Sequence, residues 1–377
     1  MFIRHRGRGG RRCLESAGRL AEPAPLNTAH ASRPRPRRWR LLLPLLGGTL
    51  LAACGGTRPE PPPAVAPAIP EPVVAPPKIG LALGGGAAKG FAHIGVIKML
   101  EANGLRPDVV AGTSAGSVVG ALYASGMDPF QLQEKAVALD EGSIRDVRLF
   151  SGGLIQGVAL QDYVNEQVRK RPIERLPRPF AAVATRLETG ERTVFVRGNT
   201  GQAVRASSSV PGVFEPVSIG PYQYVDGGVV SPVPVDAARQ LGADLVIAVD
   251  ISSKASGRRP DGMLGIVNQS IAIMGQRLGE QELARAEVVI RPDVLDYGSA
   301  DFTRRNQAII EGEKAALTAL PQIRAALEKL KAQRLQQARA EAARRAASQA
   351  PKLPPCEPRS RWNPFAGEQT GCVPVAD

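Results

Sequence analysis

The sequence predicts an α/β fold with a mostly parallel central sheet. Short apolar runs that end in glycine or a turn alternate with helical segments between residues 78 and 320, which is typical of parallel strands joined by helices. Of the 377 residues, 43% are hydrophobic and 22% are charged. This composition is near the globular average and excludes wholesale disorder and a polytopic membrane protein. At about 150 residues per domain, the length allows one large domain or two small ones.

The first half of the domain contains two strand–helix pairs. Residues 79–83 form an apolar strand that ends in glycines, and residues 90–102 form a helix with one apolar face. Residues 108–111 form a second buried strand, followed by a helix over 115–125 that is rich in Ala, Gly and Val. Further strands are expected at 181–185, 194–196, 245–249 and 288–290.

The net charge of +13 is concentrated near the two ends of the chain. Residues 1–53 hold 11 Arg and 2 Glu, and residues 321–352 hold 8 basic and 2 acidic residues. The remainder is therefore nearly neutral. A basic nucleic-acid-binding core is not supported, and we expect no nucleic-acid partner.

Residues 1–53 have the layout of a lipoprotein-type signal peptide. A run of arginines precedes the apolar residues 41–53, which are too few to span a bilayer. Leu51-Ala52-Ala53-Cys54 resembles a bacterial lipobox, in which the cysteine is lipidated. We therefore expect a lipid anchor at Cys54, with an ordinary signal cut or a short buried apolar segment as the alternatives. An anchor predicts a membrane protein of the cell envelope.

The segments that flank the domain differ in composition. Residues 54–77 are expected to be a linker after Cys54, because nine of the 21 residues from 57 to 77 are proline and favour a semi-rigid spacer. The folded domain is expected at 78–320. Residues 321–377 are expected to form an Ala/Arg-rich helix, favoured as a solvated surface helix over a membrane-binding one, and a loosely ordered tail.

Two glycines and two cysteines bear on the compartment. Gly55 and Gly56 follow the expected lipidation site, so no aspartate there marks inner-membrane retention, and the outer membrane facing the periplasm is preferred. Cys356 and Cys372 lie in the tail and can form a disulfide in an oxidising compartment.

Gly112-Thr113-Ser114-Ala115-Gly116 stands between an expected strand and an expected helix, where a nucleophile elbow belongs. Such a turn projects the serine hydroxyl from the sheet, and the following helix supplies amide donors for developing negative charge. The flanking residues must be small because the turn brings the backbone close to its neighbours. The same pattern also occurs by chance in loops, so its place in the fold decides its meaning.

Gly84-Gly85-Gly86-Ala87-Ala88-Lys89-Gly90 follows the first expected strand. A P-loop needs Ser or Thr after its Gly-Lys, and a dinucleotide fingerprint needs glycine at position 89, so both nucleotide-binding patterns fail. The loop can instead turn its N–H groups toward one point, as an oxyanion hole requires. A tight turn by itself would account for one glycine but poorly for three.

Asp226-Gly227-Gly228 would by itself indicate a turn. Its interest comes from the histidines: of His5, His30 and His93, the first two lie in the expected signal. A Ser-His-Asp triad could use only His93, and a lone helical histidine is more often structural. If Ser114 is a nucleophile, a Ser–Asp dyad is the simplest arrangement, and His93 as the base is the alternative.

The three motifs, in this order and spacing, resemble those of the patatin-like phospholipase family. Residues 206–216 also resemble the block that precedes the family's catalytic aspartate, and the resemblance covers about 78–251. It implies a three-layer α/β/α fold and a serine hydrolase that acts on phospholipids or other acyl-ester lipids. It also implies that neither a metal nor an organic cofactor is needed.

The resemblance implies a role for each motif. Asp226 would take the proton of Ser114, and the amides of Gly85, Gly86 and Ala115 would hold the oxyanion. The other motif residues would support these groups, and Lys89 would anchor its loop or favour anionic head groups. They are Gly84, Lys89, Gly90, Gly112, Gly116, Gly227 and Gly228. The alternative is a lipid-anchored envelope protein that binds acyl lipids or partners with little or no catalysis.

Overall fold

The computed structural model describes residues 70–140, 142, 146, 155–252, 262–298 and 300–349. The chain divides into Met1–Val65 and a compact unit, Ala66–Asp377. The expected signal peptide, Cys54, most of the linker and both C-terminal cysteines lie outside the described residues. Residues 70–77 of the linker are described and contain neither helix nor strand.

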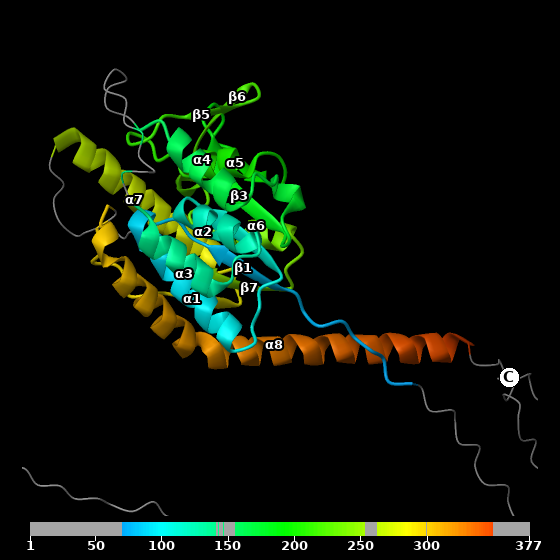
Figure 1. Ribbon diagram of the computed structural model, residues 1–377. Helices are drawn as coiled ribbons and strands as arrows, with labels where there is room; N and C mark the ends of the chain where they lie inside the picture. Colours follow the sequence, from blue (N-terminus) through cyan, green and yellow to red (C-terminus); the bar gives the residue numbers. More distant parts are fainter. Residues whose placement is uncertain are drawn as a thin grey trace, which may run out of the picture. The chain divides into compact units, whose positions relative to one another are not determined.

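An eight-stranded sheet forms the centre of the domain (Figure 1), in the order β5-β6-β3-β2-β1-β7-β8 with β4 paired to β3. Its parallel strands are β1 (Ile79–Leu83), β2 (Val109–Thr113), β3 (Phe180–Arg186), β7 (Leu245–Val249) and β8 (Val288–Ile290). The antiparallel strands are β4 (Arg192–Phe195), β5 (Val217–Ile219) and β6 (Tyr222–Asp226). The prediction of an α/β fold with a mostly parallel sheet is confirmed.

Helices cover both faces of the sheet because its strands are apolar on both sides. In β1, Leu81 and Leu83 pack into one core, and Ala82 between them packs into the other. The first core includes residues of α1 (Phe91–Ala102), α2 (Ala115–Ala124), α3 (Pro129–Ala138), α4 (Val158–Gln167), α5 (Thr200–Ser207) and α8 (Arg305–Gln349). The second core includes residues of α6 (Val235–Gln240) and the last residue of α7 (Gly262–Leu283).

The helix α8 corrects the expected domain boundary. It begins at Arg305 and continues through Pro321, so the boundary expected between residues 320 and 321 falls inside one helix. A Cβ added to Gly95 of α1 would lie 1.9 Å from the carbonyl oxygen of Ile309, and one added to Gly312 would lie 2.0 Å from that of Ala92. The two backbones therefore cross closely through glycines. After residue 327, α8 is mostly exposed. Within the described part of the chain, no helix is both long and apolar enough to cross a bilayer.

Candidate active site

Ser114 forms the turn between β2 and α2. Its backbone has φ 52° and ψ −123°, a region that side chains disfavour at a cost of about 1–3 kcal/mol. A Cβ added to Gly112 would lie 2.3 Å from the carbonyl oxygen of Gly116, and one added to Gly116 would lie 2.1 Å from that of Leu83. Close packing therefore requires glycine at both flanking positions and holds the serine in its strained conformation. The Ser114 residue is 8% exposed.

Strand β3 brings Asp226 next to the elbow. Val183 pairs with Thr113 of the parallel strand β2, and the following residue, Ala184, pairs with Asp226 of the antiparallel strand β6. Strand β4 pairs with β3 across both positions, so it occupies one edge and leaves the other edge to β2 and β6. These two strands therefore meet end to end, and their last residues adjoin Ser114.

The two oxygens of the Asp226 carboxyl group differ in their surroundings. Oδ1 accepts the N–H of Gly228 at 2.6 Å, whereas Oδ2 is buried and has no hydrogen-bond partner among the described residues. Burial raises the pKa of Asp226 to about 6, and interactions with the Ser114 side chain and the Gly228 amide act in the opposite direction. The Ser114 hydroxyl is thus close to the carboxyl group, although no hydrogen bond of ordinary geometry joins them among the described residues. Such bonds are often long in unliganded enzymes.

Two serines at the end of α5 and just after it hold the backbone N–H groups of Ser114 and Asp226 by hydrogen bonds. The hydroxyl of Ser207 accepts the N–H of Ser114 at 3.0 Å and donates to the carbonyl oxygen of Val183 at 2.6 Å. The carbonyl oxygen of Ser209 accepts the N–H of Asp226 at 2.8 Å. Both serines lie in the block, residues 206–216, that carries part of the family resemblance, but no sequence pattern indicates that they position the site.

The structure changes the expected set of oxyanion donors. The N–H of Gly85 donates to the carbonyl oxygen of Pro232 at 3.0 Å, which contradicts the expectation that this amide is free for an oxyanion. Gly85 instead meets the elbow through packing, because an added Cβ would lie 3.3 Å from the Cβ of Ser114. The N–H groups of Gly86 and Ala115 have no acceptor among the described residues. These two amides remain available.

Lys89 belongs to the glycine loop, residues 84–90, and His93 follows it. Both side chains are buried. The Nε2–H of His93 donates to the carbonyl oxygen of Gly84 at 2.8 Å, and burial lowers the pKa of His93 to about 4. The ring is therefore neutral and holds the loop. Burial also lowers the pKa of Lys89, and the charges of Asp250 and Asp296 raise it. A buried Lys89 fits the expected anchoring role better than contact with head groups.

The remaining motif glycines also stand where a side chain would clash. A Cβ added to Gly227, for example, would lie 2.1 Å from the carbonyl oxygen of Val183. Added Cβ atoms would have neighbours at 3.0 Å or less at Gly84, Gly90, Gly227 and Gly228. Among the described residues, no group of three or more His, Cys, Asp or Glu side chains could hold a metal ion.

Comparison with known proteins agrees with this geometry. Residues 81–239 match the patatin-like phospholipase family, and the match spans both the serine elbow and Asp226-Gly227-Gly228, which we call the aspartate loop. This segment of the chain is a patatin-like phospholipase domain.

The relatives match this patatin-like chain over part of their length. An uncharacterized NTE family protein of Mycobacterium tuberculosis is 37% identical over 188 residues, which are 49% of this chain and 52% of that protein. Lysophospholipase NTE1 of Pyricularia oryzae is 30% identical over 278 residues, with 65% of this chain and 18% of that protein covered. The chain thus spans about half the length of the mycobacterial relative and less of the other. The crystal structure of VipD from Legionella pneumophila has 15% identity and a TM-score of 0.44, and covers 66% of this chain and 67% of VipD.

A second buried carboxyl group lies behind the patatin-like site and was missed from the sequence. Glu282 of α7 accepts the Ser231 hydroxyl at 2.5 Å through Oε1 and the Val233 N–H at 2.9 Å through Oε2. The carbonyl oxygen of Ser231 in turn accepts the hydroxyl of Thr113 at 2.8 Å. Glu282 therefore connects α7 to the segment that follows Asp226 and to the residue before Ser114.

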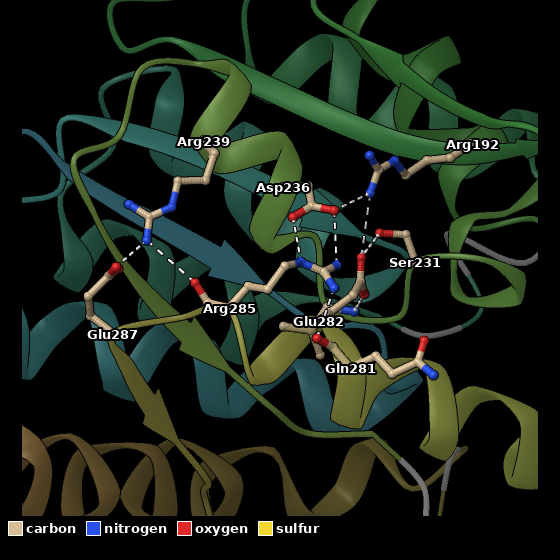
Figure 2. A network of polar contacts seen from close by, with 9 residues as sticks. Arg192, Ser231, Asp236, Arg239, Gln281, Glu282, Arg285 and Glu287 are labelled. Atoms are coloured by element: carbon tan, nitrogen blue, oxygen red, sulfur yellow. Dashed lines mark hydrogen bonds and ion pairs between the residues drawn. The ribbon is translucent and has the colours of Figure 1, made fainter.

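Charged side chains lie on one side of Glu282 (Figure 2). Arg192 lies between two carboxylates, with its Nη1 3.1 Å from Asp236 Oδ2 and 3.7 Å from Glu282 Oε1, and Arg285 pairs with Asp236 from the other side. Burial raises the pKa of Glu282 to about 7, against its hydrogen bonds and Arg192. No sequence motif surrounds this residue, so only the fold could reveal it.

Proposed function

We propose that the chain is a serine acyl hydrolase that cleaves phospholipids or related acyl-ester lipids with a Ser114–Asp226 dyad. One observation carries the proposal: Oδ2 of Asp226 is buried without a partner among the described residues, beside a serine held on a strained elbow. An unpaired carboxylate oxygen in that place is the acceptor that a serine proton needs. The patatin-like domain supports the reaction class.

In the acylation step, Oδ2 of Asp226 takes the hydroxyl proton of Ser114 while Oγ attacks the ester carbonyl carbon. The tetrahedral oxyanion accepts hydrogen bonds from the N–H groups of Gly86 and Ala115. The bond to the alcohol oxygen then breaks, and the alcohol leaves with the proton from Asp226. The acyl group remains on Ser114.

In the deacylation step, a water molecule gives a proton to Asp226 and its oxygen attacks the acyl carbon. The bond to Ser114 Oγ breaks, the serine recovers the proton from Asp226, and the fatty acid is released. The atoms and charges of both steps balance without a metal or an organic cofactor.

A fluorophosphonate probe tests the proposal, because it labels only an activated serine. We expect the full chain to be labelled and to release fatty acid from phospholipid, and we expect Ser114→Ala to do neither. An intact, lipid-binding protein without labelling or hydrolysis would support the alternative of a non-catalytic envelope protein.

We also propose that the protein is anchored in the cell envelope through lipidated Cys54, with the outer membrane facing the periplasm preferred. The support is the order of arginines, apolar run and cysteine in residues 33–54. Cys54→Ser should move the protein from detergent-extracted membranes to a soluble fraction or leave it unprocessed. Unchanged attachment and processing would contradict the anchor.

A further inference from the structure

An apolar stripe lies exposed along the first half of α7. It consists of Met263, Ile266, Val267, Ile273 and Met274, which are 82%, 55%, 47%, 47% and 55% exposed. Residues at this spacing share one face of a helix. The stripe is about 17 Å long at 1.5 Å per residue. Single exposed apolar residues are ordinary, but five on one helix face, with the exposed Ser270 between Val267 and Ile273, mark an interaction surface.

The stripe carries no charge. From Gly262 to Gln276, α7 contains no Asp, Glu, Lys or Arg, and Arg277 is its first charged residue. The C-terminal end of the same helix is different, because Glu282 and Leu283 are buried in the domain. In Figure 1 the start of α7 lies away from the sheet, and the helix runs from there toward it.

Directly after the stripe, α7 passes close to the aspartate loop. Gly275 follows Met274, and a Cβ added to it would lie 3.9 Å from the carbonyl oxygen of Gly228. The N–H of Gly228 is the one that binds Asp226 Oδ1. Gly275 lies on the side of α7 that faces this loop, and the stripe lies on the other side, so an apolar phase over the stripe would come within about one helix diameter, ~10–12 Å, of the loop that carries the proposed catalytic base.

We propose that this stripe docks on a phospholipid surface and so places the bilayer beside the Ser114–Asp226 site. The inference rests on the proposed function, since the phospholipids that such a hydrolase would cleave are held in bilayers. A lipid surface suits the stripe better than a second copy of the chain does. Five side chains with these exposures offer on the order of 500 Å², below the ~800 Å² per partner of a standard protein interface. The stripe also has no charges to fix the orientation of a protein partner.

Because the stripe carries no charge, its docking should depend neither on anionic lipid nor on salt. A basic amphipathic helix depends on anionic lipids and weakens as salt screens the attraction. An uncharged stripe should enter phosphatidylcholine vesicles as well as vesicles that contain anionic lipid, and should do so equally at low and high salt.

Lipid contact can be measured locally without turnover. In full-length Ser114→Ala protein, Ile266→Trp adds a fluorophore to the stripe, and Leu317→Trp adds one at an exposed apolar position of α8 as the matched control. Vesicles of brominated phosphatidylcholine should quench the added signal at residue 266 and not at residue 317, relative to the parent with its two tryptophans. Equal quenching at both positions, or none at 266, would overturn the docking. This result does not depend on whether Ser114 hydrolyses anything.

Hydrolysis supplies the functional counterpart. Combined Met263→Gln, Ile266→Gln and Val267→Gln should slow hydrolysis of phosphatidylcholine vesicles ~10-fold or more and change hydrolysis of a soluble short-chain ester less than ~2-fold. Ile310→Gln with Leu317→Gln on α8 is the control and should change neither rate. Equal losses on both substrates would contradict the proposal. So would a sedimentation experiment in which the wild type is a dimer and the triple variant a monomer.

Discussion

Asp226 and Glu282 are two buried carboxyl groups on either side of the same short loop, residues 227–233. They differ in whether a carboxyl oxygen lacks a hydrogen-bond partner among the described residues. Burial raises the pKa of both, to about 6 and about 7. Both oxygens of Glu282 accept hydrogen bonds, whereas Oδ2 of Asp226 accepts none among the described residues. A raised pKa therefore does not by itself identify a base. The unpaired oxygen beside a serine does so.

The two carboxyl groups also differ in their charged neighbours and in the elements that carry them. Arg192 lies 3.7 Å from Glu282, but only burial and neutral hydrogen-bonding groups determine the pKa of Asp226. Asp226 ends a strand of the central sheet, and Glu282 lies near the end of a helix. The comparison teaches that the carboxyl group with the unpaired oxygen ends a strand of the central sheet, and the fully bonded one holds the loop that follows this strand.

The largest expected effect is loss of the dyad itself. Ser114→Ala and Asp226→Asn should each reduce ester hydrolysis by ~10³-fold or more, because one removes the nucleophile and the other the proton acceptor. Asp226→Asn keeps the shape and the Oδ1 bond to Gly228, so circular dichroism and thermal unfolding should show a folded protein. A folded Asp226→Asn variant that hydrolyses ester at the wild-type rate would remove the distinction between the two carboxyl groups.

The glycine loop should give the next largest effect. A Cβ at Gly86 would lie 2.7 Å from the carbonyl oxygen of Ile251, so Gly86→Ala should displace the N–H that we assign to the oxyanion. We expect a loss of ~10²-fold in kcat, as for removal of one oxyanion donor. Gly279→Ala is the matched control, since its Cβ would meet Pro232 at an ordinary 3.5 Å. Equal rates for the two variants would contradict the assignment.

The pH dependence should reveal which carboxyl group acts. Asp226 must be ionised to accept a proton and has a pKa of about 6, so kcat/KM should fall about tenfold per pH unit below pH 6. The rate should be level above that pH. In Glu282→Gln the acid limb should keep the same midpoint, and a limb that vanished in this variant would assign the titration to Glu282.

His93→Ala should have a smaller effect on the reaction. The ring holds Gly84 and has no place in the dyad, so the folded variant should stay within about tenfold of the wild-type rate. Stability must be measured in parallel, because loss of a buried ring costs about 1–3 kcal/mol. A folded, lipid-binding His93→Ala protein as inactive as Ser114→Ala would reassign the base to His93.

Glu282→Gln should change the reaction least. The amide can accept the Val233 N–H and donate to Ser231, so we expect a rate within about threefold of wild type. The pKa of Glu282 is about 7 in the folded protein and near 4.5 when unfolded. The folded state thus holds the proton more tightly, and the free energy of unfolding falls as pH rises from about 4.5 through 7. Denaturant unfolding at pH 5 and pH 8 should show a smaller difference in the variant. An unchanged difference would contradict this contribution.

The sequence predicted the parallel half of the sheet better than the antiparallel half. Strands β1, β7 and β8 have the bounds expected for them because each is a continuous apolar run. Strand β6 begins with two exposed residues, and β5 has only three residues, so neither shows a buried pattern. The start of α8 differs from the prediction because a proline commonly ends a helix, whereas packing on α1 carries this helix through Pro321.

The candidate site also has parts that the sequence indicates and parts that only the fold reveals. Ser114 and Asp226 can be singled out as candidates from the sequence because each stands in a local motif. The bond from Gly85 to Pro232 and the buried position of Glu282 join residues far apart in the chain. No local pattern encodes such contacts, so these two features could come only from the fold.

The pairing of β7 with β1 determines what gene fusion or recombination can transfer intact. The family match ends at residue 239, but β7 pairs with β1 along its whole length, and Val249 accepts the N–H of Gly84 at 3.0 Å. A transplanted segment that stopped at the match would leave one edge of β1 open and release the glycine loop. It would also lose the cover that α8 gives to α1 as far as Leu327. The unit that can be inherited as a module therefore extends well beyond the segment that carries the motifs.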